Sequence, residues 1–157
     1  MGMDVYGKAP MIEAGRYFRN NVWWWRPLAD LCQALAPEVC KACTHWQSND
    51  GDGLDENGAL ALAFVLEARL ADGTVARLIA QRDKRIAEMP DEMCDLCIGA
   101  GMRSDKLAIE NGWHKEPCNA CNGKGAVRPW ETRYPQDEAN VRAFAAFLKA
   151  CGGFEIC

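Results

Sequence analysis

The chain has 157 residues, of which 49% are hydrophobic and 25% charged, and its formal net charge is −4. Such a length and composition are typical of a single folded domain and exclude an intrinsically disordered chain. The acidic balance also excludes the extended basic stripe of a non-specific DNA-binding protein, although it leaves a local nucleic-acid site open.

No apolar run approaches the ~20 residues that a membrane-spanning helix requires. The first residues, Met1 to Lys8, have no apolar segment of the kind found in signal peptides. The nine cysteines are an odd number in a chain without an export signal, which favours reduced thiols and metal ligands over disulfides. We therefore expect a cytoplasmic protein that makes no contact with a membrane.

The first twenty residues show no sustained periodicity, and the first predicted helix covers residues 27–36. Proline is tolerated in the first helical turn, and leucines follow Pro27 at helical spacing. A second predicted helix covers residues 56–71, with Asp55 as its cap. Apolar residues occupy much of its circumference, so we expect this helix to be central and buried.

Two further helices and a terminal strand are predicted. The third helix begins at a capping Thr74, has a one-sided apolar stripe and ends near Pro90. The last helix begins near Pro135 and is ended by Gly152 and the glycine that follows it. The alternating tail, residues 154–157, could add a short strand.

Two copies of the pattern C-x-x-C-x-G-x-G lie between residues 91 and 130. The first copy supplies Cys94 and Cys97, and the second supplies Cys118 and Cys121. Two such pairs are the usual sequence form of a structural zinc site with four thiolate ligands. The glycines permit positive φ and bring backbone N–H groups close to the thiolates. Because all four ligands are sulfur, we predict one structural zinc ion and no catalytic one.

This segment resembles the cysteine-rich zinc domain of DnaJ-type chaperones, which repeats the same pattern. That family usually carries four repeats for two zinc ions, whereas this chain has two repeats, enough for one ion. The chain lacks the His-Pro-Asp tripeptide of the J domain. The resemblance therefore implies the metal and a V-shaped pair of β-hairpins, and it does not carry over co-chaperone activity.

The whole chain also resembles a family of uncharacterised bacterial and phage proteins. The segments that carry this resemblance are Met3 to Gly7, Tyr17 to Leu28 and Gly152 to Cys157. It implies no activity.

Together these features predict an α+β fold with a mainly helical small core and an inserted four-cysteine zinc β-hairpin module. We expect one domain over residues 1–157, with residues 91–130 as the DnaJ-like zinc-binding insertion.

A second group of metal-ligating residues is weaker. Cys40, Cys43 and His45 have the ligand types of a zinc site. Only one C-x-x-C pair is present, and the spacing from Cys43 to His45 is unusual. Buried small side chains beside a loop are the favoured interpretation.

Trp23, Trp24 and Trp25, followed by Arg26, form the most unusual local feature. Three adjacent indoles cannot all face one side of a regular element. Tryptophan and arginine are enriched at protein interfaces and can also stack on nucleobases, which makes these four residues a candidate binding surface. The alternative is a small satellite core under the N-terminal loop.

Three functional classes follow. The favoured class is a small structural-zinc binding module that acts through a protein partner, as a phage or prophage factor would act on a host system. The second is a nucleic-acid accessory protein, for which five arginines should cluster: Arg16, Arg19, Arg26, Arg128 and Arg133. The third is an enzyme that uses the region from Cys40 to Asp52, with His45 near an acidic residue in a cleft. The sequence has no recognisable catalytic motif, and we assign no catalytic residue.

Overall fold

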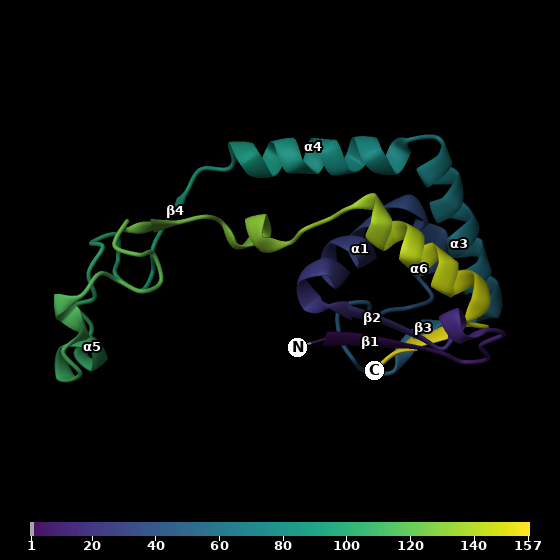
Figure 1. Ribbon diagram of the computed structural model, residues 1–157, viewed down its shortest axis with the longest axis horizontal. Coiled ribbons are helices and arrows are strands. Elements are labelled where there is room, and N and C mark those ends of the chain that lie inside the picture. Colours follow the sequence, from purple (N-terminus) through teal and green to yellow (C-terminus); the bar gives the residue numbers. More distant parts are fainter. Residues whose placement is uncertain (1) are drawn as a thin grey trace. The chain divides into compact units, whose positions relative to one another are not determined.

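The computed structural model describes residues 2–157. The chain divides into two compact units, which we name the core unit (residues up to Asp83, together with Tyr134–Cys157) and the cysteine unit (Lys84–Arg133). Helices and antiparallel sheet are both present, which confirms the predicted α+β class (Figure 1). The expectation of one domain with an insertion over residues 91–130 stays a prediction.

The sheet of the core unit has four antiparallel strands in the order β2-β1-β6-β3. The strands are β1 (Gly2–Gly7), β2 (Tyr17–Asn21), β3 (Asp52–Leu54) and β6 (Phe154–Ile156). The hairpin of β1 and β2 lies in the segment for which the sequence showed no period, because each strand is too short for its alternation to stand out. The predicted terminal strand is confirmed as β6, and it lies between β1 and β3.

Helix α1 (Val22–Leu35) begins earlier than the sequence predicted. The side-chain oxygen of Asn21 accepts hydrogen bonds from the backbone N–H groups of Trp23 and Trp24, at 3.0 and 3.1 Å. This cap satisfies two of the free donors at the helix start, so Pro27 lies inside the helix and not in its first turn. The short helix α2 (Pro37–Cys40) follows directly.

The three later long helices agree with the sequence analysis. They are α3 (Glu56–Ala71), α4 (Thr74–Glu88) and α6 (Glu138–Ala150). The side chains of Asp55 and Asp137 cap α3 and α6, whereas the N–H of Thr74 is bonded to Asp72. Helix α3 packs against α6, but it is buried on one side only, since Leu60 and Phe64 are exposed.

The core forms where α1, α3 and α6 cover one face of the sheet (Figure 1). Its centre is aromatic: Trp25 makes an edge contact with Phe144, and Phe144 makes another with Phe154. The indole N–H of Trp25 donates to the backbone oxygen of Trp46 at 2.6 Å. Since both groups are buried, this hydrogen bond ties α1 to the loop between α2 and β3.

The cysteine unit has few regular elements. They are β4 (Glu92–Met93), the five-residue α5 (Lys106–Glu110) and β5 (Ala126–Val127), with β4 and β5 paired antiparallel. Across residues 2–157, no helix has the length and apolar character needed to span a bilayer.

The buried indole of Trp25 gives a test of the core. Replacing Trp25 with Phe leaves the Trp46 carbonyl without its donor, which should cost about 1–3 kcal/mol of unfolding free energy. Trp24→Phe is the matched control, since Trp24 is only half-buried. Urea denaturation should show the larger loss for Trp25→Phe, and equal losses would contradict this account of the core.

Candidate metal centre

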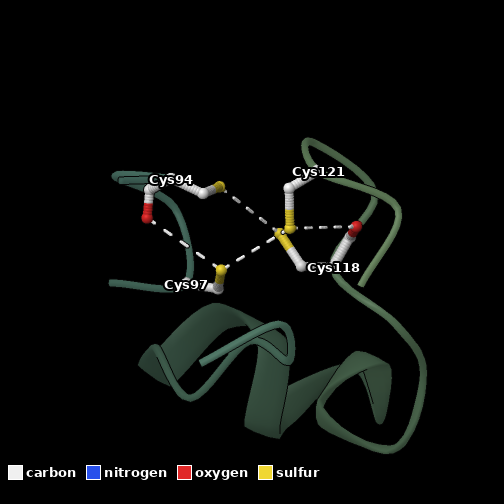
Figure 2. A group of neighbouring side chains, drawn as sticks. All are labelled: Cys94, Cys97, Cys118 and Cys121. Carbon is white, nitrogen blue, oxygen red and sulfur yellow. Dashed lines mark hydrogen bonds between the residues drawn. The ribbon is translucent and has the colours of Figure 1, made fainter. Parts of the chain in front are cut away.

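The four cysteines of the two predicted motifs come together in the cysteine unit. Their sulfur atoms all lie within 4.8 Å of one another, and every one of these side chains is buried. Cys94 and Cys97 come from one turn and Cys118 and Cys121 from the other, with their sulfurs facing a common centre (Figure 2). This arrangement could hold a metal ion.

The sulfur spacing suits tetrahedral coordination. The Sγ atoms of Cys94 and Cys118 are 3.9 Å apart, and those of Cys97 and Cys121 are 3.7 Å apart. A tetrahedron with Zn–S bonds of about 2.3 Å requires sulfur atoms about 3.8 Å apart. These two distances lie on either side of that value, and all four sulfurs lie within 4.8 Å of one another, so the donor set suits an ion of this size.

The two turns have matching backbones. We name them the first knuckle (residues 92–102) and the second knuckle (residues 116–126). The N–H of Cys94 donates to the oxygen of Gly125 at 2.9 Å, and the N–H of Cys118 donates to the oxygen of Gly101 at 2.8 Å. Each knuckle therefore donates one equivalent backbone hydrogen bond to the other. This reciprocal pair relates the two knuckles by an approximate twofold axis.

A backbone donor approaches one thiol in each knuckle. The N–H of Gly101 lies 3.3 Å from the sulfur of Cys97, and the N–H of Gly125 lies 3.2 Å from the sulfur of Cys121. These are the glycine donors that the sequence pattern predicted. Four thiolates around a divalent ion leave a charge of about −2, and such donors stabilise that excess.

The same glycines allow the knuckles to approach each other. Gly101 and Gly125 have φ values of +73° and +74°. A Cβ on Gly101 would lie 2.4 Å from the backbone oxygen of Gly123, and a Cβ on Gly125 would lie 2.2 Å from that of Gly99. Glycine is thus required twice over, by its backbone conformation and by the close contact between knuckles. The sequence indicated the first reason but not the second.

The cluster has one thiol that ionises most easily. Burial works against ionisation of Cys121, but the N–H of Gly125 and the neighbouring thiols outweigh it and lower the pKa of Cys121 to about 7. Burial raises the pKa of Cys97 to about 11, although the N–H of Gly101 offsets part of that effect. A metal ion that binds all four sulfurs must therefore displace protons.

The other candidate ligands do not form a second centre. Among residues 2–157, no further group of three or more cysteine, histidine or carboxylate ligands gathers in this way. Cys40 and Cys43 are buried, and burial raises their pKa values to about 11 and about 12. The favoured interpretation of Cys40, Cys43 and His45, as side chains beside a loop, agrees with this geometry.

His45 does lie near an acidic residue, as the enzyme hypothesis required. Its Nδ1 atom is 3.7 Å from Oδ2 of Asp52, beside a depression lined by Asp30, Gln33 and residues 44–48. The same carboxylate oxygen accepts the backbone N–H groups of Thr44 and His45, at 2.6 and 2.8 Å. The His45 N–H lowers the pKa of Asp52, with smaller contributions from Gly53 and Thr44. These hydrogen bonds give Asp52 a structural role, because its carboxylate fixes the backbone of the loop at Thr44 and His45. The thiol of Cys43 is buried, which does not suit a nucleophile that must reach a substrate.

The three tryptophans have different environments. Trp25 is completely buried and belongs to the core, and the binding surface of Trp23, Trp24, Trp25 and Arg26 stays a prediction. Trp23 and Trp24 are half-buried, and the ring of Trp23 packs against Tyr134, with centroids 5.2 Å apart. The guanidinium of Arg26 lies over the same tyrosine ring, at 5.9 Å.

Three of the five arginines of the nucleic-acid hypothesis have local acidic partners. Arg16 pairs with Glu13 and Arg19 with Asp4. In the cysteine unit, Arg128 pairs with Asp91, at 3.3 Å. Carboxylates beside the guanidinium groups weaken the positive potential that phosphate binding requires.

Comparison of the chain with protein-family models, with curated proteins and with solved structures finds no match. The resemblances to the DnaJ-type zinc domain and to bacterial and phage proteins therefore depend on the sequence motifs alone.

The contact between the knuckles can be tested with two alanine substitutions. Gly112 has a φ of +76° but no atom within 4 Å of its Cβ position, so Gly112→Ala should cost only about 1 kcal/mol. Gly125→Ala adds the clash with the Gly99 oxygen and should greatly reduce metal retention. Metal content after dialysis against a chelator distinguishes the two variants, and equal retention would show that the knuckles do not need this contact.

Proposed function

We propose that the chain is a small zinc-stabilised binding module that acts through a protein partner. Cys94, Cys97, Cys118 and Cys121 hold one structural zinc ion in this proposal. The observation that carries it is the convergence of four buried sulfurs from two matching knuckles, at spacings that suit a tetrahedral ion.

The donor set favours zinc over other metals. Soft thiolates select zinc, copper(I) or iron, and a tetrahedral four-sulfur site is typical of zinc and of iron–sulfur proteins. No ligand position is left for water or substrate in a closed site of four sulfurs, so the ion stabilises structure and does not catalyse a reaction.

The composition of the cysteine unit explains why it needs a metal. Its buried hydrophobic cluster consists of the four cysteines, with Val127 packed against them. The strands β4 and β5 pair over only two residues each. So small a core cannot offset the conformational entropy that folding removes, and zinc binding supplies the missing free energy.

Exposed apolar side chains support the assignment of a protein partner. Seven residues of the cysteine unit contribute large exposed hydrophobic groups in addition to Met93: Leu96, Ile98, Met102, Leu107, Ile109, Trp113 and Trp130. Apolar surface of this kind is typical of protein interaction sites. The sequence resemblance to bacterial and phage proteins suggests a component of a bacterial host as that partner.

Zinc stoichiometry tests the ligand assignment. Purified protein should contain about one zinc ion per chain, and Cys118→Ser should lower that content because serine is a poor zinc ligand. Cys157→Ser is the control, since Cys157 is exposed and outside the cluster. Inductively coupled plasma mass spectrometry measures the metal. Full zinc content in Cys118→Ser would overturn the assignment.

Zinc removal should destabilise one unit selectively. With a strong chelator at neutral pH, the amides of Cys94 and Cys118 should lose protection against hydrogen exchange, whereas amides of α6 should keep theirs. Acidification should have the same effect, because protons compete with zinc for the thiolates and lower its affinity as the pH falls. Unchanged protection in the cysteine unit after zinc removal would contradict a structural role for the ion.

A further inference from the structure

The two knuckles share a backbone but differ in their side chains. Residues separated by 24 positions are equivalent, as Cys94 is to Cys118 and Gly101 to Gly125. At six equivalent positions the first knuckle carries apolar or acidic residues and the second smaller, polar or basic ones. The pairs are Met93 and Pro117, Asp95 and Asn119, Leu96 and Ala120, Ile98 and Asn122, Ala100 and Lys124, and Met102 and Ala126. Since the same backbone accommodates both sets of side chains, the four-cysteine site does not require the side chains of the two knuckles to differ.

Ile98 is the clearest case. It has a φ of +50°, and Asn122 has a φ of +49° at the equivalent position. Asparagine tolerates this left-handed conformation, whereas a β-branched residue is strained in it. Ile98 is also 74% exposed, so it gains little from burial within its own chain. The residue is therefore unfavourable for the fold in two ways, and an apolar contact with another molecule would account for it.

Ile98 belongs to an apolar patch on the first knuckle. Met93 and Leu96 are 59% and 39% exposed. The side chain of Met93 lies beside Gly99, since a Cβ on that glycine would be 3.4 Å from the Met93 Cγ atom. Met93 thus lies beside the residue that follows Ile98 in the chain, and Leu96 is between the two cysteines of the same turn. We name these three residues the knuckle patch.

The charges that the first knuckle itself carries are negative, and the nearby Arg128 is already paired with Asp91. Glu92 and Asp95 are exposed, and within the described part of the chain neither has an ion-pair partner. Residues 92–100 contain no lysine or arginine, whereas the second knuckle has Lys124 beside its Glu116. A zinc ion bound by four thiolates adds a net charge of about −2. An apolar patch in a negative field suits a partner that is apolar and basic.

We propose that the knuckle patch is a docking surface for a basic amphipathic segment of a protein partner. The segment's apolar side chains would cover Met93, Leu96 and Ile98, and its lysines or arginines would lie near Glu92 and Asp95. This inference rests on the proposed function, because the zinc ion holds the first knuckle in shape and contributes to its negative field. It deepens that function by naming the surface and the chemistry of the partner.

The test uses the zinc-loaded full chain and two synthetic amphipathic peptides. One peptide is built from leucine and lysine, and its twin has glutamate in place of every lysine; both carry a fluorescent label. Fluorescence anisotropy should show binding of the lysine peptide and none of the glutamate peptide. Binding should weaken as salt is raised, because the charges involved are exposed. Binding of both peptides, or of neither, would overturn the proposal.

Two variants place second-knuckle residues in the first knuckle. Ile98→Asn should weaken binding of the lysine peptide at least tenfold and leave the zinc content unchanged, since asparagine is already accommodated at position 122. Asp95→Asn should weaken binding and reduce its dependence on salt. Ile109→Asn is the matched control, because Ile109 is 56% exposed but lies on α5, outside the knuckle patch. An equal loss in Ile109→Asn would show general hydrophobic adsorption and overturn the proposal.

Measurement of zinc in every sample separates the two proposals. A wild-type chain that holds zinc but does not bind the lysine peptide contradicts only the docking surface. A wild-type chain that holds no zinc contradicts the proposed function, whatever the peptide does.

Discussion

The structure of the cysteine unit depends on the approach of two turns that each carry a pair of sulfurs. Their contact requires two reciprocal backbone hydrogen bonds and glycine at the points where the chains would otherwise collide. Bringing four thiols into one buried site has a cost, because ionisation of one opposes ionisation of the next. A tetrahedral divalent ion that bound all four thiolates would remove that cost, and in the proposed function it would have a structural role in a unit with almost no other core.

The duplicated turn can carry different side chains on one backbone. One backbone and one ligand set are used twice, so neither knuckle needs particular side chains at the positions between its cysteines and glycines. The second knuckle has small and polar residues there, including an asparagine that tolerates its left-handed conformation. The first has exposed apolar and acidic residues at the same positions. Such differences on a common scaffold are where a binding preference can arise without loss of the fold.

The core unit is stabilised by side-chain packing and buried hydrogen bonds. Its centre is a set of aromatic contacts under α1, α3 and α6, together with buried indole hydrogen bonds from Trp25 to Trp46 and from Trp46 to Cys40. Packing and hydrogen bonds of this kind need no metal. Of the three adjacent tryptophans, Trp25 is fully buried in this core, whereas Trp23 and Trp24 are half-buried. If the cysteine unit is stabilised by coordination, as proposed, the two units should respond to different perturbations.

Features that depend on short-range chemistry could be predicted from the sequence. The caps and apolar periods of α3 and α6 and the spacing of the cysteine pairs were readable, because a helix start or a C-x-x-C turn is encoded within a few residues. Three features could not be predicted and came from long-range contacts: which of the three tryptophans is buried, the outward orientation of Leu60 and Phe64, and the place of β1 between β2 and β6 in one sheet. The tertiary structure also decided that Cys40, Cys43 and His45 do not gather as a metal site. These outcomes depend on contacts between residues far apart in the chain, whose geometry no local pattern encodes.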